Sequence, residues 1–293
     1  MTAALDSLAR ENGTFLMVAM DQRESLRQML AERHGAPIED DRLRLFKLAV
    51  ARTLAPHSSA FLIDRLYGFD AVVRDGLLPD DCGLILAADK IVPGEEGPVA
   101  DTELDEGVDA HAAAAAGAVA LKLLVVWRDD ERRAHRLATA RRFVETTSAA
   151  GLVSVLEGVV RPAEGGRNFD REAAIVEAAR ELASVGPSLY KVEVPLYGRG
   201  DPGELEQRCR QLDAVLGCPW VVLSAGVDPD AFPAAVGGAC RAGASGILAG
   251  RAIWRRAVSA ADPAAAMRAD AVPRLQQLAE VVDRYGRPWN ERT

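Results

Sequence analysis

Eight short apolar runs alternate with longer amphipathic stretches from one end of the chain to the other. Short runs of this kind are typical of strands buried on both faces, and the stretches between them carry a helical period. We expect strands at residues 14–20, 60–63, 84–88, 119–126, 152–156, 189–194, 220–223 and 246–249, and helices at 40–54, 129–149, 170–184, 202–216, 229–242 and 271–285. Asp129, Asp170, Pro202 and Pro229 suit the starts of four of these helices.

This alternation predicts an α/β protein, a (β/α)8 TIM barrel that occupies residues 1–293 as a single domain. The alternative, a doubly wound sheet, would carry a glycine-rich phosphate loop after its first strand. The chain instead has Asp21-Gln22-Arg23-Glu24 at that place, without a glycine. Because no change in composition marks a second domain, we expect one barrel.

Lysine is scarce in this chain: only four of its 35 lysine and arginine residues are lysines. Two of them, Lys122 and Lys191, lie within predicted strands. Unlike arginine, lysine can lose its proton near neutral pH and attack a carbonyl carbon to form a Schiff base. Both are therefore candidate catalytic amines. The alternative is an outward-facing lysine or a buried cation paired with a carboxylate such as Glu193.

The predicted barrel places the two lysines on its fourth and sixth strands, whose inward side chains share the same layers. Glu157 ends the strand between them. A nearby like charge and a water-poor interior both lower a lysine pKa. We expect a neutral amine, a second ammonium and a carboxylate to meet there, which is what imine-based cleavage of a carbon–carbon bond requires.

Polar residues and glycines also follow the last two predicted strands. Ser224 and Gly226 come after the seventh strand, and Gly250 and Arg251 come after the eighth. Barrels often bind phosphate at these turns through backbone N–H groups and a short helix N-terminus, and an arginine adds a bidentate donor. We therefore expect an oxyanion site. Asp89 and Arg128, after the third and fourth strands, are expected only to cap or neutralise helix starts.

Composition restricts the partners of the protein. The formal net charge is −8 without a basic cluster, which argues against nucleic acid, and the apolar runs are too short to cross a membrane. The four cysteines lack CxxC spacing and suit reduced thiols in a cytoplasmic protein. The four histidines lack the spacing of metal ligands, so we expect no metal. The first residues do not have the order of a signal peptide.

Two connections are longer than the others: residues 91–107, which are acidic, and residues 158–169, which contain Arg161 and Arg167. Both would follow strands and so lie on the face where barrels place their active sites. We interpret the first connection as an ordinary solvated insertion. Its acidic tract, from Glu95 to Glu106, is expected to face solvent and not to hold a metal.

Several motifs occur in order along nearly the whole chain. They are Met20-Asp21-Gln22-Arg23-Glu24, Val159-Val160-Arg161-Pro162, Leu189-Tyr190-Lys191-Val192-Glu193, and residues 120–128, 151–154, 195–198, 223–224, 226–228, 243–246 and 248–252. With these motifs the chain resembles the class I Schiff-base aldolases that include tagatose 1,6-bisphosphate aldolase. It looks closest to the 6-deoxy-6-sulfofructose 1-phosphate aldolases of sulfoquinovose breakdown (sulfoglycolysis).

The resemblance implies that Lys191 forms the Schiff base, that Lys122 and Glu157 assist proton transfer, and that Asp21 lies in the active site. It implies a homo-oligomer without a metal or other cofactor. The implied substrate is a small ketose phosphate, 6-deoxy-6-sulfofructose 1-phosphate, cleaved to dihydroxyacetone phosphate and 3-sulfolactaldehyde. The expected substrate-binding residues are Gln22, Arg161, Ser224, Gly226, Gly250 and Arg251.

Other activities remain open at this point. The substrate could be tagatose or fructose 1,6-bisphosphate, the enzyme could be a deoxyribose-phosphate-type lyase, or the barrel could sense sugar phosphates without catalysis. Arg161 is the candidate contact outside the oxyanion site, because residues 159–162 are shared with the sulfosugar enzymes; its alternative is a surface arginine. Gly158 departs from a family proline and is expected to loosen a turn. Lys90, where an acidic residue is expected, is interpreted as a surface change.

Overall fold

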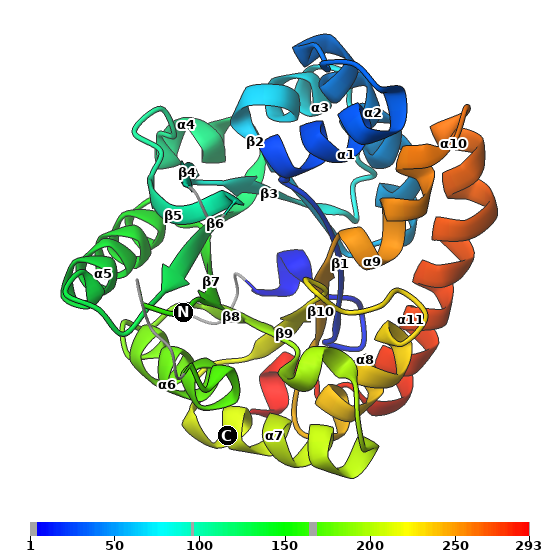
Figure 1. The fold of residues 1–293 in the computed structure, drawn as a ribbon. Coiled ribbons are helices and arrows are strands. Elements are labelled where there is room, and N and C mark those ends of the chain that lie inside the picture. Colours follow the sequence, from blue (N-terminus) through cyan, green and yellow to red (C-terminus); the bar gives the residue numbers. More distant parts are fainter. Residues whose placement is uncertain (1–4, 95–96, 164–168, 293) are drawn as a thin grey trace.

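Eight parallel strands close into a barrel in the computed structural model, which describes residues 5–94, 97–163 and 169–292 (Figure 1). The strands follow one another around the barrel in the order β1, β2, β3, β6, β7, β8, β9, β10. Their bounds are β1 Phe15–Met20, β2 Ala60–Asp64, β3 Gly83–Ala87, β6 Ala118–Trp127, β7 Val153–Val160, β8 Leu189–Glu193, β9 Trp220–Leu223 and β10 Gly246–Ala249. The predicted fold class is confirmed.

Helices surround the barrel in Figure 1. The α-helices are α1 Glu24–His34, α2 Asp40–Leu54, α3 Asp70–Arg74, α4 Ala110–Ala115, α5 Arg133–Ala149, α6 Arg171–Ala183, α7 Pro202–Val215, α8 Phe232–Arg241, α9 Arg251–Trp254, α10 Pro263–Ala266 and α11 Val272–Tyr285. Short 3-10 or π segments are η1 Leu5–Leu8, η2 Ala55–His57, η3 Arg65–Phe69, η4 Pro195–Gly198, η5 Arg255–Ser259, η6 Met267–Ala271 and η7 Trp289–Glu291. None of the helices in the described ranges is both long and apolar enough to cross a membrane.

The expected helix starts are confirmed at two of four places. Asp170 accepts a hydrogen bond from the N–H of Ala173 at 3.1 Å and so caps α6, and Pro202 lies in the first turn of α7. Helix α5 begins at Arg133, because Asp129 pairs with that arginine at 2.9 Å one turn outside the cap position. Helix α8 likewise begins later than predicted, at Phe232.

Residues 91–107 were expected to form an ordinary solvated insertion; apart from buried Asp101 their described residues are exposed or half-buried, but they form an ordered hairpin and not a plain loop. Strands β4 (Asp89–Gly94) and β5 (Gly97–Leu104) pair as an antiparallel hairpin above the barrel. Buried Asp101 binds Arg132 at 2.8 Å and Arg136 at 3.4 Å, which fixes the hairpin to α5. Arg128, expected to cap a helix, donates to the carbonyl of Ala100 at 3.1 Å. Of the acidic tract, Glu95 lies outside the described residues, as does its neighbour at position 96.

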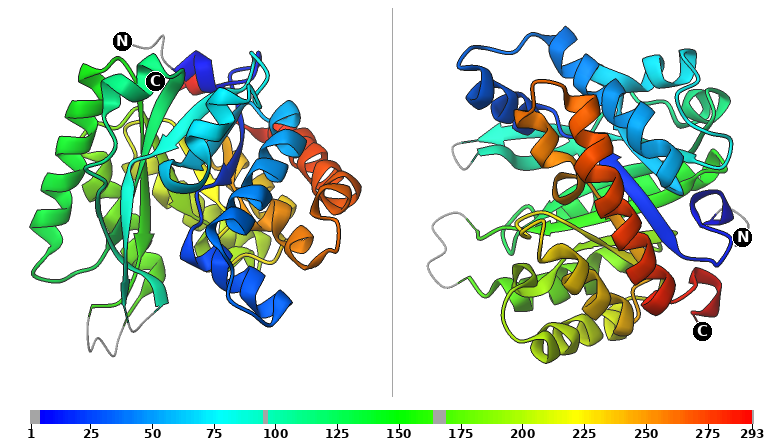
Figure 2. Two further views of the ribbon diagram at one scale, coloured as in Figure 1. Left: turned by 90° about the horizontal axis from the view of Figure 1, so that it is seen from above. Right: turned by 90° about the vertical axis from the view of Figure 1, so that its right-hand side faces the viewer.

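An apolar floor fills the lower part of the barrel. Side chains of alternate strand residues form it: Phe15, Met17, Ala19, Ala60, Leu62, Ile85, Ala87, Ala120, Val153, Val155, Leu189, Val221 and Leu248. Segment η1 and Trp289 join this cluster from below. Figure 2 shows that both termini lie at the end of the barrel opposite the β4–β5 hairpin. The barrel is therefore closed at one end, and its inward side chains near the hairpin are available for function.

Gly158 lies inside a strand and not in a turn, so the predicted loosening of a turn is wrong. Strand β7 continues to Val160, and Gly158 is paired with Val192 of β8. A Cβ atom at Gly158 would lie 2.2 Å from the hydroxyl oxygen of Tyr190. That hydroxyl is fully buried, and burial raises the Tyr190 pKa well above its usual range. Glycine is therefore required here because the tyrosine fills the space of a side chain.

Replacing Gly158 with alanine should lower the free energy of unfolding by about 1–3 kcal/mol, the usual cost of overpacking. Most of this loss should disappear in the Tyr190→Phe background, because the clashing oxygen is then absent. Chemical denaturation of the four variants measures both values. Gly217→Ala is the matched control, since a Cβ there meets nothing within 4 Å. Equal losses in both backgrounds would contradict this explanation.

Candidate active site

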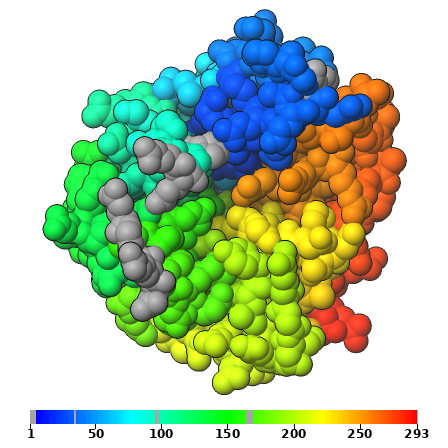
Figure 3. Space-filling model, viewed as in Figure 1, coloured from blue at the N-terminus to red at the C-terminus, as the bar shows by residue number. Residues whose placement is uncertain are grey.

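A cavity of about 650 Å³ opens at the carboxyl ends of the strands. Figure 3 shows this face of the molecule, hollowed near the centre where the blue, green and orange segments meet. Seven predicted site residues line the cavity: Asp21, Gln22, Lys122, Glu157, Arg161, Lys191 and Arg251. Ser224, Gly226 and Gly250 are not among its lining residues, although Ala225 is.

The alternation of strand side chains explains why these residues meet. Each of five polar residues lies two positions after a residue of the apolar floor: Asp21 after Ala19, Asp89 after Ala87, Lys122 after Ala120, Glu157 after Val155, and Lys191 after Leu189. Because strand side chains alternate between faces, the five form the next inward layer. A polar layer therefore lies directly on the apolar floor.

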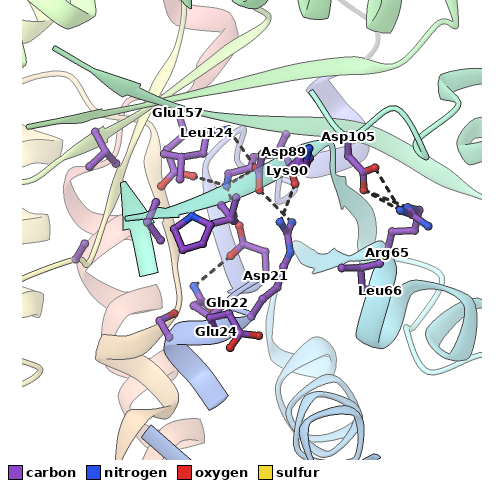
Figure 4. A pocket seen from close by; sticks show the side chains of 18 of the residues that line it. Asp21, Gln22, Glu24, Arg65, Leu66, Asp89, Lys90, Asp105, Leu124 and Glu157 are labelled. Atoms are coloured by element: carbon purple, nitrogen blue, oxygen red, sulfur yellow. Dashed lines mark hydrogen bonds and ion pairs between the residues drawn. The ribbon is translucent and has the colours of Figure 1, made fainter. Parts of the chain in front are cut away.

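Lys122 is surrounded by three carboxylates. Its Nζ lies 2.8 Å from Asp21 Oδ2, 2.9 Å from Asp89 Oδ2 and 2.8 Å from Glu157 Oε2, and the side chain is only 2% exposed. Figure 4 labels the three carboxylate residues. Burial acts to lower the pKa of Lys122, but the three negative charges outweigh it and raise this pKa well above its ordinary value. Lys122 is therefore an ammonium, which corresponds to the second ammonium expected from the sequence.

Lys191 has a different environment. Its side chain is 4% exposed and lines the cavity, so the amine lies inside the barrel as predicted. Its Nζ donates to Glu157 Oε2 at 3.0 Å, because Glu157 and Lys191 are direct register partners on β7 and β8. Among the described residues this is its only ion pair. Glu193, the alternative partner, instead accepts from the N–H of Val160 at 2.8 Å.

Glu157 thus contacts both lysines through one oxygen atom. The Oε2 atom is 2.8 Å from Lys122 Nζ and 3.0 Å from Lys191 Nζ. A carboxylate within hydrogen-bond distance of two amines can take a proton from one and return it to a bound molecule. The geometry expected of these three residues from the sequence is therefore present, although their catalytic roles remain a proposal.

Asp21 and Gln22 form the wall next to Lys122. Burial acts to raise the pKa of Asp21, but the charges of Lys122 and Lys191 outweigh burial and hold it well below its usual range. Gln22 Nε2 donates to Asp21 Oδ1 at 3.1 Å. The other end of this amide, Oε1, is buried and has no partner among the described residues. Gln22 therefore has an unused hydrogen-bond acceptor in the wall of the cavity.

Asp89 is the site residue that the sequence interpretation missed. Its Oδ2 accepts from Lys122 Nζ at 2.9 Å and from the N–H of Leu124 at 3.1 Å, and its Oδ1 accepts from Arg23 at 3.0 Å. It starts β4 and is 1% exposed, so it joins the hairpin to the polar layer. Its position in the sequence could have identified it. Asp89 lies two residues after Ala87 of the apolar floor, and each of the other inward polar residues also lies two residues after a floor residue.

Two arginines that line the cavity have no carboxylate within 4.0 Å in the described part of the chain, Arg161 and Arg251. Within the described ranges, Arg161 donates to the neighbouring carbonyl of Val160 at 2.8 Å. Burial lowers the pKa of Arg251, and the charges of Arg255 and Arg161 act in the same direction, against the charges of Asp21 and Glu157. Both arginines are half-buried, and a half-buried cation without a paired carboxylate favours an anionic ligand.

The predicted glycines of the oxyanion site serve close packing. A Cβ atom at Gly250 would lie 2.5 Å from the carbonyl oxygen of Ala19, so this glycine lets the eighth turn approach β1. Ser224 Oγ accepts from the N–H of Ala252 at 3.3 Å and so links the turns after β9 and β10. These contacts explain why neither residue lines the cavity. Their role in binding an anion remains a prediction.

The β4–β5 hairpin forms one wall of the cavity. Ile91 and Val99 of the hairpin pack with Leu124 and Val159 of the upper barrel. Lys90, at the start of the hairpin, lines the cavity (Figure 4) and is 63% exposed. Its ion-pair partner is Glu103, at 3.4 Å. The departure at Lys90 is an exposed residue, as expected, and it places a positive charge on the rim of the cavity.

Comparison with known proteins identifies the family. The sequence profile of the DeoC/LacD family aldolases matches residues 15–256, which is most of the chain. Tagatose 1,6-diphosphate aldolase 2 of Streptococcus pyogenes serotype M1 is 27% identical over 314 aligned positions, which cover 96% of this chain and 94% of that protein. Tagatose 1,6-diphosphate aldolase of Staphylococcus haemolyticus is 28% identical over 282 positions, covering 87% and 85%.

Solved aldolase structures share the fold. An archaeal fructose-1,6-bisphosphate aldolase with its catalytic lysine bound to a carbinolamine has a TM-score of 0.65 at 17% identity, covering 97% of this chain and 99% of that chain. Fructose-bisphosphate aldolase from Plasmodium falciparum has a TM-score of 0.70 at 12% identity, covering 98% and 94%. The chain therefore belongs to the DeoC/LacD family of aldolases. It is a lyase, a class I aldolase of the DeoC/LacD type, as the sequence predicted.

Replacing Lys122 with methionine should cost about 3–5 kcal/mol of folding stability at pH 8, because three buried carboxylates lose their common cation. In the wild type the lowered Asp21 pKa gives stability that is lost only as the pH falls well below the ordinary carboxyl range. In the variant, burial without a cation raises carboxyl pKa values, so protonation relieves the repulsion. The difference from wild type should therefore shrink between pH 8 and pH 5.

Denaturant unfolding at both pH values measures this difference. Lys90→Met is the matched control, because that lysine is exposed and should change stability little at either pH. A loss that stays the same at pH 5 and pH 8 would show that the three carboxylates do not depend on Lys122.

Proposed function

We propose that the protein cleaves 6-deoxy-6-sulfofructose 1-phosphate into dihydroxyacetone phosphate and 3-sulfolactaldehyde through a Schiff base on Lys191. The observation that carries the choice of nucleophile is the unequal surroundings of the two buried lysines. Lys122 is held charged by three carboxylates, whereas Lys191 contacts one. An amine must lose its proton before it attacks a carbonyl carbon, so Lys191 is the better nucleophile.

The first half of the reaction forms the imine. The neutral amine of Lys191 attacks C2 of the ketose and gives a carbinolamine. Glu157, 3.0 Å from that amine, takes the proton that the Lys191 ammonium loses before the attack and returns it to the C2 oxygen, which leaves as water together with the proton from the carbinolamine nitrogen. Lys122 stays an ammonium throughout, and its charge stabilises the carboxylate form of Glu157 at 2.8 Å.

The second half breaks the C3–C4 bond. A carboxylate takes the proton of the C4 hydroxyl group, the bond electrons move into the iminium to give an enamine, and the aldehyde leaves. Glu157 and Asp21 both line the cavity as carboxylates that can act as this base. Protonation of the enamine at C3 and attack of water on the iminium then release dihydroxyacetone phosphate and restore Lys191.

The unpaired arginines support a substrate with an anion at each end. Arg251 and Arg161 line the same cavity without a carboxylate partner in the described ranges. A phosphate carries about −1.5 to −2 at pH 7, while a sulfonate carries one charge and needs fewer cations. We propose that Arg251, with the turns at Ser224, Gly226 and Gly250, binds one anion, that Arg161 binds the other, and that Gln22 binds a hydroxyl group.

A ketose bisphosphate is the second candidate substrate, because the relatives named above are tagatose 1,6-diphosphate aldolases. A deoxyribose-phosphate-type activity would need only one of the two unpaired arginines. A sensor without turnover would need no second lysine. The ketose phosphate is therefore the better match to this cavity. A homo-oligomer and a cytoplasmic location remain predictions from the sequence.

Borohydride added together with the ketose phosphate should reduce the imine and attach the three-carbon fragment permanently to Lys191. Peptide mass spectrometry locates the adduct. Lys191→Met should abolish the adduct and lower the cleavage rate by several orders of magnitude, on the order of the 10⁴-fold or greater losses seen for other nucleophiles. An adduct on Lys122, or on no lysine, would exclude the proposed nucleophile.

The substrate is tested by comparing kcat/KM for sulfofructose 1-phosphate with those for tagatose and fructose 1,6-bisphosphates. We expect the sulfosugar to be cleaved at least about tenfold more efficiently, as one well-placed interaction in the transition state can provide. Arg161→Met should reduce this preference, with Arg65→Met as control because Arg65 is already paired with Asp105. A preference for either bisphosphate would replace the substrate while leaving the fold and the nucleophile unchanged.

A further inference from the structure

The turn that follows the strand of Lys191 has an unusual backbone. Segment η4 contains Leu196 and Tyr197 at φ values of 56° and 52°, and they are the only non-glycine residues with positive φ in the described part of the chain. Gly198 follows at φ 70°. Residues with side chains in the left-handed region cost about 1–3 kcal/mol each and persist only where the surroundings hold them. The strained residues begin three positions after Glu193, the last residue of β8. Such strain requires a physical cause.

Two residues at the start of α6 hold the strained turn. Glu172 Oε1 accepts from the N–H of Leu196 at 3.1 Å. Arg171 donates to Glu193 Oε1 at 3.2 Å, and its guanidinium lies 3.7 Å from the centre of the Tyr197 ring. Arginine stacked on a tyrosine face is attracted by the ring electrons and limits its movement. Tyr197 is 41% exposed and yet is fixed in position.

The fixed ring lies against the turn after β9. A Cβ atom at Gly226 would be 2.5 Å from Tyr197 Cδ1 and 2.8 Å from Cε1, so the backbone of Gly226 rests directly on the ring. A Cβ atom at Gly198 would be 3.0 Å from the Val227 side chain, so the contact continues along the turn. The residue before Gly226 is Ala225, which lines the cavity.

We propose that Tyr197 is a positioning residue, which holds the Ala225–Gly226 backbone so that its N–H groups face the anionic group bound by Arg251. This inference rests on the proposed function, because it needs an anion at that end of the cavity. It explains the strain at η4: the left-handed conformation directs the ring of Tyr197 onto Gly226. It also explains Gly226, which has φ 76° and no room for a side chain.

The network reaches the other side of the site as well. Glu193, which binds Arg171, accepts from the N–H of Val160 through its other oxygen at 2.8 Å. Val160 immediately precedes Arg161. The strained turn therefore contacts two parts of the site. Tyr197 lies against the backbone of Gly226, beside the anion that we propose Arg251 binds. Through Arg171 and Glu193, the turn is also joined to the backbone next to Arg161.

The test is to replace Tyr197 with alanine or phenylalanine and to measure kcat, KM and inhibition by inorganic phosphate. Tyr197→Ala should raise KM and the phosphate inhibition constant about tenfold with kcat changed less than about twofold, because preorganised backbone donors are lost from binding. Tyr197→Phe keeps the ring and should behave like wild type. Circular dichroism checks that each variant is folded.

A double-mutant cycle with Gly226→Ala tests the contact itself. The added methyl group clashes with the Tyr197 ring, so Gly226→Ala should weaken phosphate binding strongly in the wild type and less in the Tyr197→Ala background. Additive effects of the two substitutions would overturn the proposal, as would a Tyr197→Ala variant whose KM and phosphate inhibition are unchanged. A loss confined to kcat would also overturn it, because the turn would then act on Lys191.

Two further variants separate this inference from the proposed function. Arg251→Met should weaken phosphate inhibition whether or not Tyr197 has the proposed role. If phosphate inhibition is unchanged in Arg251→Met, the anion site is misplaced and the role of Tyr197 fails with it, while the Schiff base on Lys191 is judged separately by borohydride trapping. If Arg251→Met weakens inhibition and Tyr197→Ala does not, only the role of Tyr197 is wrong. Tyr285→Ala is the matched control, since it removes a tyrosine that contacts Arg241 and Arg284 outside the cavity.

Discussion

The ammonium of Lys122 is the charge on which the rest of the site depends. Three carboxylates converge on it inside the barrel, and burying them without a cation would cost several kcal/mol each. Because the cluster requires Lys122 to stay charged, the second lysine is left with one partner and with access to the cavity. The difference between two chemically identical side chains thus arises from strand register, which brings Asp21 and Asp89 beside Lys122 and leaves Lys191 opposite Glu157.

Much of this arrangement follows from sequence alone, because it depends on alternation along strands. The eight apolar runs predicted the barrel, and the inward period brought Lys122, Glu157 and Lys191 together. Asp89 follows the same alternation, but it was assigned to a helix start because the β4–β5 hairpin that begins at this residue was interpreted as a loop. That hairpin is held by Asp101, Arg128 and Arg136, whose pairing depends on the folded position of α5. Such contacts between distant segments leave no local signal.

The glycines show the same limit. Gly158, Gly226 and Gly250 each have a neighbour from another segment where a side chain would be: the hydroxyl of Tyr190, the ring of Tyr197 and the carbonyl of Ala19. From sequence, Gly226 and Gly250 suggested exposed backbone N–H groups, and Gly158 suggested a loose turn. In the structure all three permit close approach, and only the two in turns lie near the proposed anion site. Which of the two lysines stays charged was not predicted for a related reason, because the three carboxylates around Lys122 come from three separate segments of the chain.

The scarcity of lysine has a practical consequence. Lys47, Lys122 and Lys191 have 0%, 2% and 4% of their side chains exposed, and Lys90 has 63%. A bulky amine-reactive dye can therefore reach one lysine side chain, and that side chain stands on the rim of the cavity. Labelling this lysine would place a fluorescent reporter on the rim of the cavity without any substitution in the chain.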